Sequence, residues 1–158
     1  MATWMEFEAA APDLASAGQA LLYQFGPGLA FLATVRRDGG PRLHPICPIV
    51  VEGGLYAMIT DSPKRADLLR DGRYALHTFP PKDVDDEFSV SGRARFVPDA
   101  DRHAAVLAAL RALGVASEES DLLFEFEIDR AFHAAYKPRA AGWQPPTHRT
   151  WRAPTAPG

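Results

Sequence analysis

The sequence lacks the features that mark several large classes of protein. Cys47 is its one cysteine, so no disulfide can form within the chain. No apolar run approaches the roughly 20 residues that cross a bilayer, and residues 1–8 show no basic flank leading into an apolar stretch. We therefore expect a soluble, cytoplasmic protein with no membrane association, which folds without disulfide bonds.

The sequence also lacks an excess of basic residues. The formal net charge is -3 and the isoelectric point is about 5.9, which argues against a surface built mainly for nucleic acid. The chain after Asp129 is the exception, because it contains no acidic residue. Its aromatic and basic side chains could stack on and neutralise a single strand; they are Trp143, Trp151, Arg139, Arg149 and Arg152.

No cluster of catalytic or metal-binding residues stands out. We find no catalytic triad and no paired carboxylates, and His77, His103 and His133 share no metal-ligand spacing. Cys47 and His44 have the composition of a thiol nucleophile pair, but three residues apart on a strand they point to opposite faces. We therefore expect no metal site and an inert Cys47, and the sequence identifies no catalytic residue.

The size and composition are those of one packed domain. The chain has 158 residues, of which 47% are hydrophobic and 23% charged, and it shows no internal repeat or interdomain linker. We expect a single domain over residues 1–152 and a flexible tail over residues 153–158.

The apolar pattern predicts an antiparallel barrel with a few short helices. Helices are expected at residues 12–25, 62–71 and 99–113, where apolar residues recur at helical spacing or where cap residues stand at both ends. Apolar β-type runs separated by turn residues predict six or seven strands, the first three forming a meander. These runs cover residues 29–35, 41–51, 55–60, 73–79, 88–97, 122–128 and 131–137. The class is mainly β (α+β), with no repeated β-α-β unit.

Proline marks the second predicted strand as irregular. Proline is abundant, with 14 residues, and Pro41, Pro45 and Pro48 all lie in this strand. Each lacks an N–H, so part of the ladder cannot form. Backbone groups left free in this way can meet a planar ligand.

The start of the second predicted helix is suited to bind an anion. Ser62, Pro63, Lys64 and Arg65 place a hydroxyl, unpaired backbone N–H groups and two cations at a helix N-terminus, where the macrodipole favours negative charge. The alternative is that Ser62 only caps the helix and the two cations are solvated.

The order and spacing of these segments resemble the pyridoxamine 5′-phosphate oxidase-like family of flavin-binding split β-barrels. The resemblance covers about residues 29–97 and lies in the succession LAFLATV, DGGPRLHPI, EGGLYAMITDSPKRADLLRDGRYAL and FSVSGRARFV. The ending RTWRAP is similar to endings in this family, more weakly. The resemblance implies a six- to seven-stranded antiparallel split β-barrel and favours the anion site, because the family binds the flavin phosphate at the S-x-K position.

The resemblance further implies a function and a set of cofactor-binding residues. It suggests an FMN-dependent oxidoreductase acting on a small molecule, as a homodimer with flavin sites between the two chains. Relatives that use F420, and haem-handling proteins without turnover, share the barrel, so these remain alternatives. The implied cofactor-binding residues are His44, Pro45, Ile46, Cys47, Ile59, Thr60, Ser62, Lys64, Arg65 and Trp151. The C-terminal aromatic residues would then pack over a cofactor rather than bind nucleic acid.

Two residues depart from the pattern of the oxidases that act on pyridoxamine phosphate. His44 falls where those enzymes carry a phosphate-binding arginine, and Ile49 falls where they carry a lysine. His44 can act only as a hydrogen-bond donor or when protonated, and Ile49 provides no charge. We therefore expect a different substrate. Because a flavin carries the redox chemistry itself, the absence of a catalytic dyad is expected.

Overall fold

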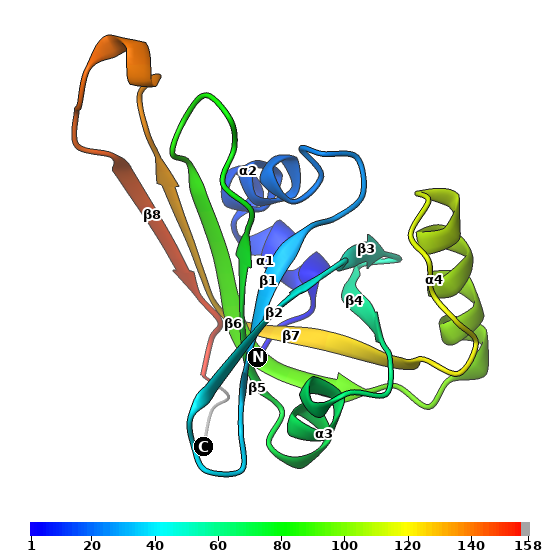
Figure 1. Cartoon of the computed structure of the whole chain (residues 1–158). Helices are drawn as coiled ribbons and strands as arrows, with labels where there is room; N and C mark the ends of the chain where they lie inside the picture. Colours follow the sequence, from blue (N-terminus) through cyan, green and yellow to red (C-terminus); the bar gives the residue numbers. More distant parts are fainter. Residues whose placement is uncertain (156–158) are drawn as a thin grey trace.

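The computed structural model describes residues 1–155, and these form a curled antiparallel sheet with helices around it (Figure 1). The helices are α1 (Trp4–Ala10), α2 (Pro12–Leu22), α3 (Pro63–Arg70) and α4 (Ala100–Ala112), with a short 3-10 helix at Arg139–Ala141. The strands are β1 (Ala30–Val35), β2 (Pro41–Ile46), β3 (Ile49–Val51), β4 (Gly54–Ile59), β5 (Arg73–Thr78), β6 (Glu87–Phe96), β7 (Leu122–Ala135) and β8 (Thr147–Arg152). This is the expected split barrel.

The long strand β7 organises the sheet. The strand order is β2-β1-β5-β6-β7-β4-β3, and β8 also pairs with β7. One edge of β7 pairs with β6. The other edge pairs with β4 over Leu122 to Glu125, with Ala2 at Ile128, and with β8 from Arg130 onward. One strand therefore joins the two parts of the split barrel.

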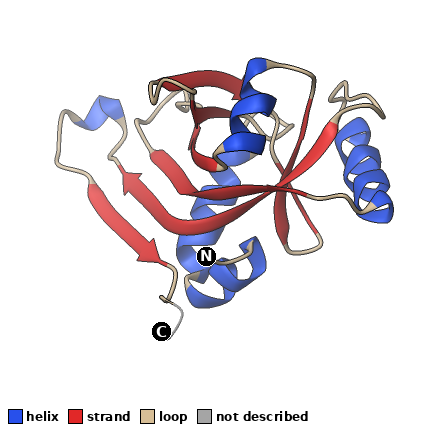
Figure 2. Ribbon diagram, turned by 90° about the horizontal axis from the view of Figure 1, so that it is seen from below, coloured by secondary structure: helices blue, strands red, loops and turns tan. Residues whose placement is uncertain are grey.

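The helices cover different parts of the sheet. Figure 2 shows α1 and α2 packed together and α4 set apart at one end. Trp4 and Phe7 of α1 lie in the main core, which fills the inside of the curl. Val106 and Leu110 of α4 instead form a second, smaller core with Tyr56. None of the helices within residues 1–155 has the length and apolar character needed to cross a membrane.

The structure corrects several expected boundaries. Residues 4–10 form α1, which was not predicted, and α2 ends at Leu22 rather than at residue 25. The two strands expected at 122–128 and 131–137 are one strand, β7, because Asp129 is accommodated as an irregularity opposite Ser91 and Gly92 of β6. The C-terminal segment contributes β8. The helices expected at 62–71 and 99–113 are confirmed within one residue at each end.

The expected strand over residues 41–51 is broken at Cys47 and Pro48. Its first part is β2, the edge strand beside β1, and its second part is β3, which pairs only with β4 at the other end of the strand order. The expected antiparallel pairing of this segment with the strands before and after it is confirmed. The three strands do not lie side by side as a meander, because the segment is broken. The turn is tightly packed, because a Cβ at Gly28 would lie 2.0 Å from the carbonyl oxygen of Pro48. Only glycine allows this approach.

The expected flexible tail over residues 153–158 is tested only at its start. Ala153 is buried, and its N–H donates to the carbonyl of Asp129 at 2.8 Å. Residues 156–158 lie outside the described part of the chain.

The side of the sheet that faces away from the main core is covered by α4 only over β3 and β4. The strands β1 and β2 expose an apolar strip there, which we call the outer face. Cross-strand register pairs Phe31 with Pro45, Ala33 with Leu43 and Val35 with Pro41. Leu43 is 64% exposed. The three β2 residues of this strip are exposed, and the three β1 residues are partly exposed.

A buried carboxylate ties α3 to β1 and β2. Asp67 is 4% exposed, and it accepts hydrogen bonds from Arg42 Nε at 2.7 Å, Thr34 Oγ1 at 3.0 Å and Arg70 Nη1 at 3.2 Å. Burial alone would raise the pKa of Asp67, but the hydrogen bonds outweigh it and the pKa is lowered. The ionised carboxylate therefore holds α3 in place.

We expect the Asp67→Asn variant to lose stability at neutral pH but not in acid. The loss in the free energy of unfolding should be about 1–2 kcal/mol, because asparagine keeps one acceptor oxygen but leaves the partly exposed Arg42 without its counter-charge. A lowered folded-state pKa stabilises the fold above the ordinary aspartate pKa of about 3.9, and this stabilisation is lost as the pH falls through the folded-state value. Urea unfolding at neutral and acid pH should thus show a smaller acid-induced loss for the variant than for the wild type. Equal losses would contradict the role given to the ionised Asp67.

Candidate functional site

The N-terminus of α3 has no side-chain cap. Ser62 occupies the N-cap position, but its hydroxyl accepts no hydrogen bond from the first turn; instead Ser62 Oγ donates to the carbonyl of Thr60 at 2.9 Å. Pro63 has no N–H, and within residues 1–155 the amides of Lys64 and Arg65 have no acceptor. Ser62 is thus the N-cap residue by position, but the alternative in which its side chain caps the helix does not hold. The amides stay available to an anion.

A cavity of about 140 Å³ lies at this helix end. Three chain segments from different parts of the sequence meet around it: the end of β2, the end of β4 with α3, and the loop between α4 and β7. The lining residues are Pro45, Ile46, Cys47, Met58, Thr60, Lys64, Val115, Ala116, Ser117 and Asp121. Figure 1 shows α3 and α4 at the same end of the sheet.

The loop between α4 and β7 was missed by the sequence analysis. Its residues have no motif, and only the packing of α4 against β3 and β4 brings the loop to the α3 terminus. The loop is held by α4, since Arg111 Nη2 donates to the carbonyl of Ser117 at 3.1 Å. His103 Nε2 also lies 2.8 Å from the carbonyl of Asp121. The pattern of hydrophobic residues in α4 predicts the helix but not this loop position.

The structure brings together five of the ten residues expected to bind the cofactor. Pro45, Ile46, Cys47, Thr60 and Lys64 all line the cavity. Their grouping depends on the break at Pro48, which ends β2 next to the α3 terminus.

The other five do not line it. Ser62 and Arg65 lie beside it on the first turn of α3, and Arg65 forms an ion pair with Asp61. Ile59 is buried in the main core, and His44 is half-buried on β2 next to Pro45. Trp151 lies opposite Ala131.

Trp151 is remote from the cavity within one chain. It packs against Phe7 of α1, with ring centroids 5.0 Å apart. The ten residues of β7 from Leu122 to Ala131 correspond to roughly 30 Å of extended chain. A cofactor contact of Trp151 therefore stays a prediction, and it could come only from a second copy.

Cys47 shows no sign of activation. Burial raises the pKa of its thiol, so the nucleophilic thiolate is disfavoured. Within residues 1–155 no three His, Cys, Asp or Glu side chains are grouped so that they could hold a metal ion. The cavity offers a cation, backbone amides and apolar side chains, together with the carboxylate of Asp121. The cation and the amides suit binding of an anionic ligand.

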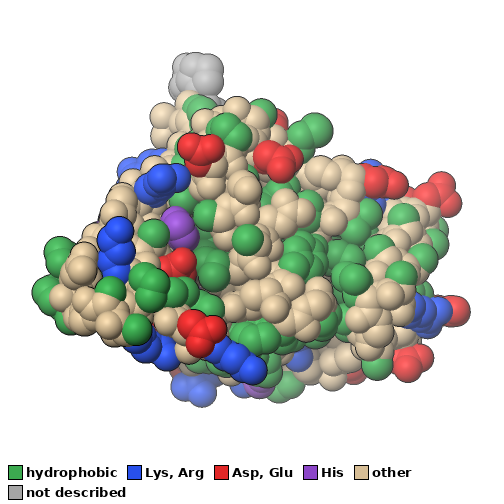
Figure 3. Space-filling model, turned by 90° about the horizontal axis from the view of Figure 1, so that it is seen from above, with side chains coloured by type: hydrophobic (Ala, Val, Ile, Leu, Met, Phe, Trp, Pro, Cys, Tyr) green, Lys and Arg blue, Asp and Glu red, His purple; other side chains and the backbone are tan. Residues whose placement is uncertain are grey.

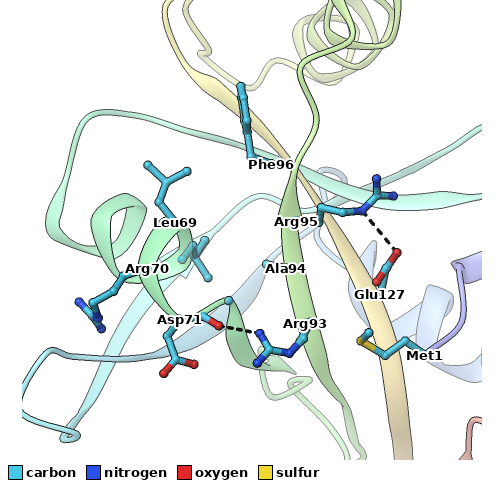
Figure 4. A pocket seen from close by; sticks show the side chains of 11 residues that line it. Met1, Leu69, Arg70, Asp71, Arg93, Ala94, Arg95, Phe96 and Glu127 are labelled. Carbon is cyan, nitrogen blue, oxygen red and sulfur yellow. Dashed lines mark hydrogen bonds and ion pairs between the residues drawn. The ribbon is translucent and has the colours of Figure 1, made fainter. Parts of the chain in front are cut away.

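A second cavity, of about 420 Å³, lies at the other end of α3 (Figure 4). Its charged side chains already have partners: Arg95 pairs with Glu127, Arg93 Nη1 donates to the carbonyl of Asp71 at 2.8 Å, and Arg70 pairs with Asp67. The helix C-terminus also disfavours negative charge. We therefore take the smaller cavity as the candidate site.

On the face shown in Figure 3, acidic side chains lie among the basic ones, with hydrophobic side chains between them. In the C-terminal segment, Arg139 pairs with Asp85 and also donates to the carbonyl of Lys82. Arg139 therefore connects the segment between β7 and β8 to the loop between β5 and β6.

Comparison with known proteins identifies the family. Residues 19–134 match the family model described as pyridoxamine 5′-phosphate oxidase, whereas no curated protein gives a significant match. Among solved structures, HupZ of Group A Streptococcus is similar with 15% identity and a TM-score of 0.61, over 75% of this chain and 91% of that one.

Two further structures share the fold. A heme binding protein from Mycobacterium smegmatis has 16% identity and a TM-score of 0.62, over 85% of this chain and 57% of that one. A NimC/NimA family protein from Clostridium acetobutylicum has 17% identity and a TM-score of 0.58, over 77% and 86%. At these identities the likeness establishes the fold alone. With the split barrel and the family match over most of its length, the chain belongs to the pyridoxamine 5′-phosphate oxidase-like family.

Proposed function

We propose that this protein is an FMN-dependent oxidoreductase that binds the flavin phosphate at the N-terminus of α3. The observation that carries the proposal is the uncapped first turn, with Lys64 and free amides at a cavity. A phosphate accepts hydrogen bonds from such amides, and both the helix dipole and the lysine favour its charge.

The cavity fits a phosphate but not a whole flavin. Its volume of about 140 Å³ is below the range of about 300–1,000 Å³ that is usual for drug-sized ligands. The flavin ring must therefore extend beyond it. Pro45 lines the cavity and also belongs to the outer face through its pairing with Phe31, so the ring would leave the cavity towards that face.

A second copy of the chain would complete the site. The outer face exposes Leu43 and its neighbours, and an uncovered apolar strip of this kind is typical of an interface. We therefore propose a homodimer in which two outer faces meet and enclose the two flavins.

The chain's own residues would bind and orient the cofactor. When bound, FMN supplies the hydride chemistry. Lys64 and the α3 amides hold its phosphate, Thr60 and the end of β2 border the cavity, and Cys47 stays a neutral thiol.

The structure disfavours pyridoxamine phosphate as the substrate. Ile49 is 4% exposed and packs with Tyr56 and α4, so its position cannot supply a cation to a second phosphate. A different small molecule is therefore the substrate we propose. F420 also carries a phosphate and would use the same helix end.

The absorbance spectrum of the freshly purified protein tests the choice of cofactor. We expect a flavin band, and apo protein titrated with FMN should quench the flavin fluorescence at a ratio of one FMN per chain. Colourless protein that binds F420 but not FMN would identify the deazaflavin instead.

Haem binding is a second candidate, because of one histidine. His77 is exposed on β5 opposite Phe31, and Phe31 stacks on Phe79 with ring centroids 4.3 Å apart. His77 Nδ1 lies 2.7 Å from the carbonyl of Thr78. A histidine that donates from one ring nitrogen to a carbonyl has its other nitrogen free as a metal ligand.

Haemin titration separates the two candidates. If the protein binds haem, haemin should give a sharp Soret band that is lost in the His77→Ala variant but retained in the matched His148→Ala variant, whose histidine is also exposed. If FMN is the cofactor, FMN affinity should depend on Lys64, and haemin should give no band that depends on His77.

A further inference from the structure

The cavity at the α3 terminus has an acidic wall as well as a basic one. Asp121 lines it together with Lys64, although the residue is only 5% exposed. Its Oδ2 accepts a hydrogen bond from the Glu118 amide at 3.0 Å. Its Oδ1 receives no hydrogen bond from residues 1–155, and it is not among the fully buried unpaired atoms of that range. This oxygen is therefore open to accept a hydrogen bond from a ligand in the cavity.

The carboxylate is fixed before any ligand binds. The Asp121 amide donates to the carbonyl of Glu118 at 3.1 Å, which closes a reciprocal pair with the Glu118 amide. His103 on α4 holds the Asp121 carbonyl at 2.8 Å. Arg111 holds the carbonyl of Ser117 in the same loop. The position of Asp121 is therefore set by contacts within its own loop and with two residues of α4.

A phosphate bound at the N-terminus of α3 would interact with both Lys64 and Asp121. Lys64 and the helix dipole attract it, whereas the Asp121 carboxylate repels a second anion in a small cavity. The repulsion is reduced further if the ligand places a hydrogen-bond donor next to its phosphate. Hydroxyl groups on the adjoining carbon chain are such donors, and a hydrogen bond from a hydroxyl to a carboxylate is stronger than a neutral one.

We propose that Asp121 is a specificity-determining residue that accepts a hydrogen bond from a hydroxyl of a polyol chain attached to the bound phosphate. The site then selects polyol phosphates over simple alkyl phosphates. This inference rests on the proposed function, because it places the phosphate at α3. The polyol chain is a part of the ligand that the α3 amides, which bind the phosphate, do not recognise.

The Asp121→Asn variant tests this role. Asparagine keeps the side-chain size and the acceptor for the Glu118 amide but loses the charge. With D-ribitol 5-phosphate and ethyl phosphate as probes in NMR titrations, we expect the variant to bind ribitol 5-phosphate about tenfold more weakly, as expected for a lost charge-assisted hydrogen bond. Ethyl phosphate should bind as well as before or more tightly. If the two affinities change by the same factor and in the same direction, Asp121 does not recognise the polyol chain.

A measurement on the wild type makes the test independent of whether the Asp121→Asn variant folds. The wild type should prefer ribitol 5-phosphate over ethyl phosphate, and equal affinities would overturn the inference even if the variant does not fold. Measuring FMN binding distinguishes a failure of this inference from a failure of the proposed function. Selective binding of ribitol 5-phosphate without binding of FMN would contradict the flavin but leave Asp121 in its role, whereas FMN binding that is unchanged in Asp121→Asn would contradict only the role of Asp121.

Discussion

The Leu43→Arg variant should be a monomer that no longer retains FMN. Leu43 is 64% exposed in the single chain, so a charge there costs little in folding. In the proposed homodimer two arginines would be brought into an apolar interface without partners. Leaving buried charges uncompensated costs about 3–5 kcal/mol, so the dimer should dissociate at least about a hundredfold more readily. Sedimentation velocity measures the oligomeric state.

Leu113→Arg is the matched control for this change. Leu113 is also an exposed leucine, but it lies at the C-cap of α4 and not on the outer face. The control should remain a dimer and bind FMN. A Leu43→Arg variant that stays dimeric would place the interface elsewhere, and one that is monomeric but binds FMN normally would contradict a site shared between copies.

Replacing Lys64 with alanine should weaken FMN binding about ten- to hundredfold, which corresponds to the loss of a charge-assisted contact of about 1.5–3 kcal/mol. The melting temperature of the apo protein should hardly change, because a cation in the first turn of a helix is slightly unfavourable to the helix dipole. Riboflavin, which has no phosphate, should bind the variant and the wild type equally. FMN titration of the apo proteins gives the affinities.

Lys82→Ala is the control for Lys64→Ala. Lys82 is an exposed lysine in the loop between β5 and β6, away from the residues that line the cavity, and its removal should leave FMN affinity unchanged. An unchanged FMN affinity in a normally folded Lys64→Ala variant would place the phosphate elsewhere. Ser62→Ala is a second probe of the site, because the Ser62 hydroxyl does not cap the amides of the helix and its loss should not destabilise the helix end.

The sequence predicted the elements better than their connections. Apolar residues at regular spacing located β1, β4, β5, β6, α2 and α4, whereas cap residues at both ends located α3. The proline-rich stretch around Pro48 indicated an irregular strand, but it did not predict that the strand divides into β2 and β3. Whether the chain continues beside β1 or crosses to β4 depends on the close approach of Gly28 to Pro48, which is a tertiary contact.

The candidate site was likewise predicted in part. Lys64 and Thr60 were found because the S-x-K pattern and the end of a strand lie within five residues of each other. Asp121 and Ser117 were not, because they are more than fifty residues away and carry no motif. Only the packing of α4 on Tyr56 and Ile49 brings their loop to the α3 terminus. Sequence patterns identify sites formed by residues that are close in the sequence. The side of a cavity that a distant loop forms can be identified only from the three-dimensional fold.

Sedimentation velocity followed at both the protein and the flavin absorbance bands tests the central claim most directly. After addition of one FMN per chain, the flavin should sediment with a species of twice the chain mass of 17.2 kDa, and Lys64→Ala should leave most of the flavin unsedimented at concentrations that saturate the wild type. Flavin that remains free with the wild type, or that sediments with a monomer, would contradict an FMN site at α3 completed by a second copy.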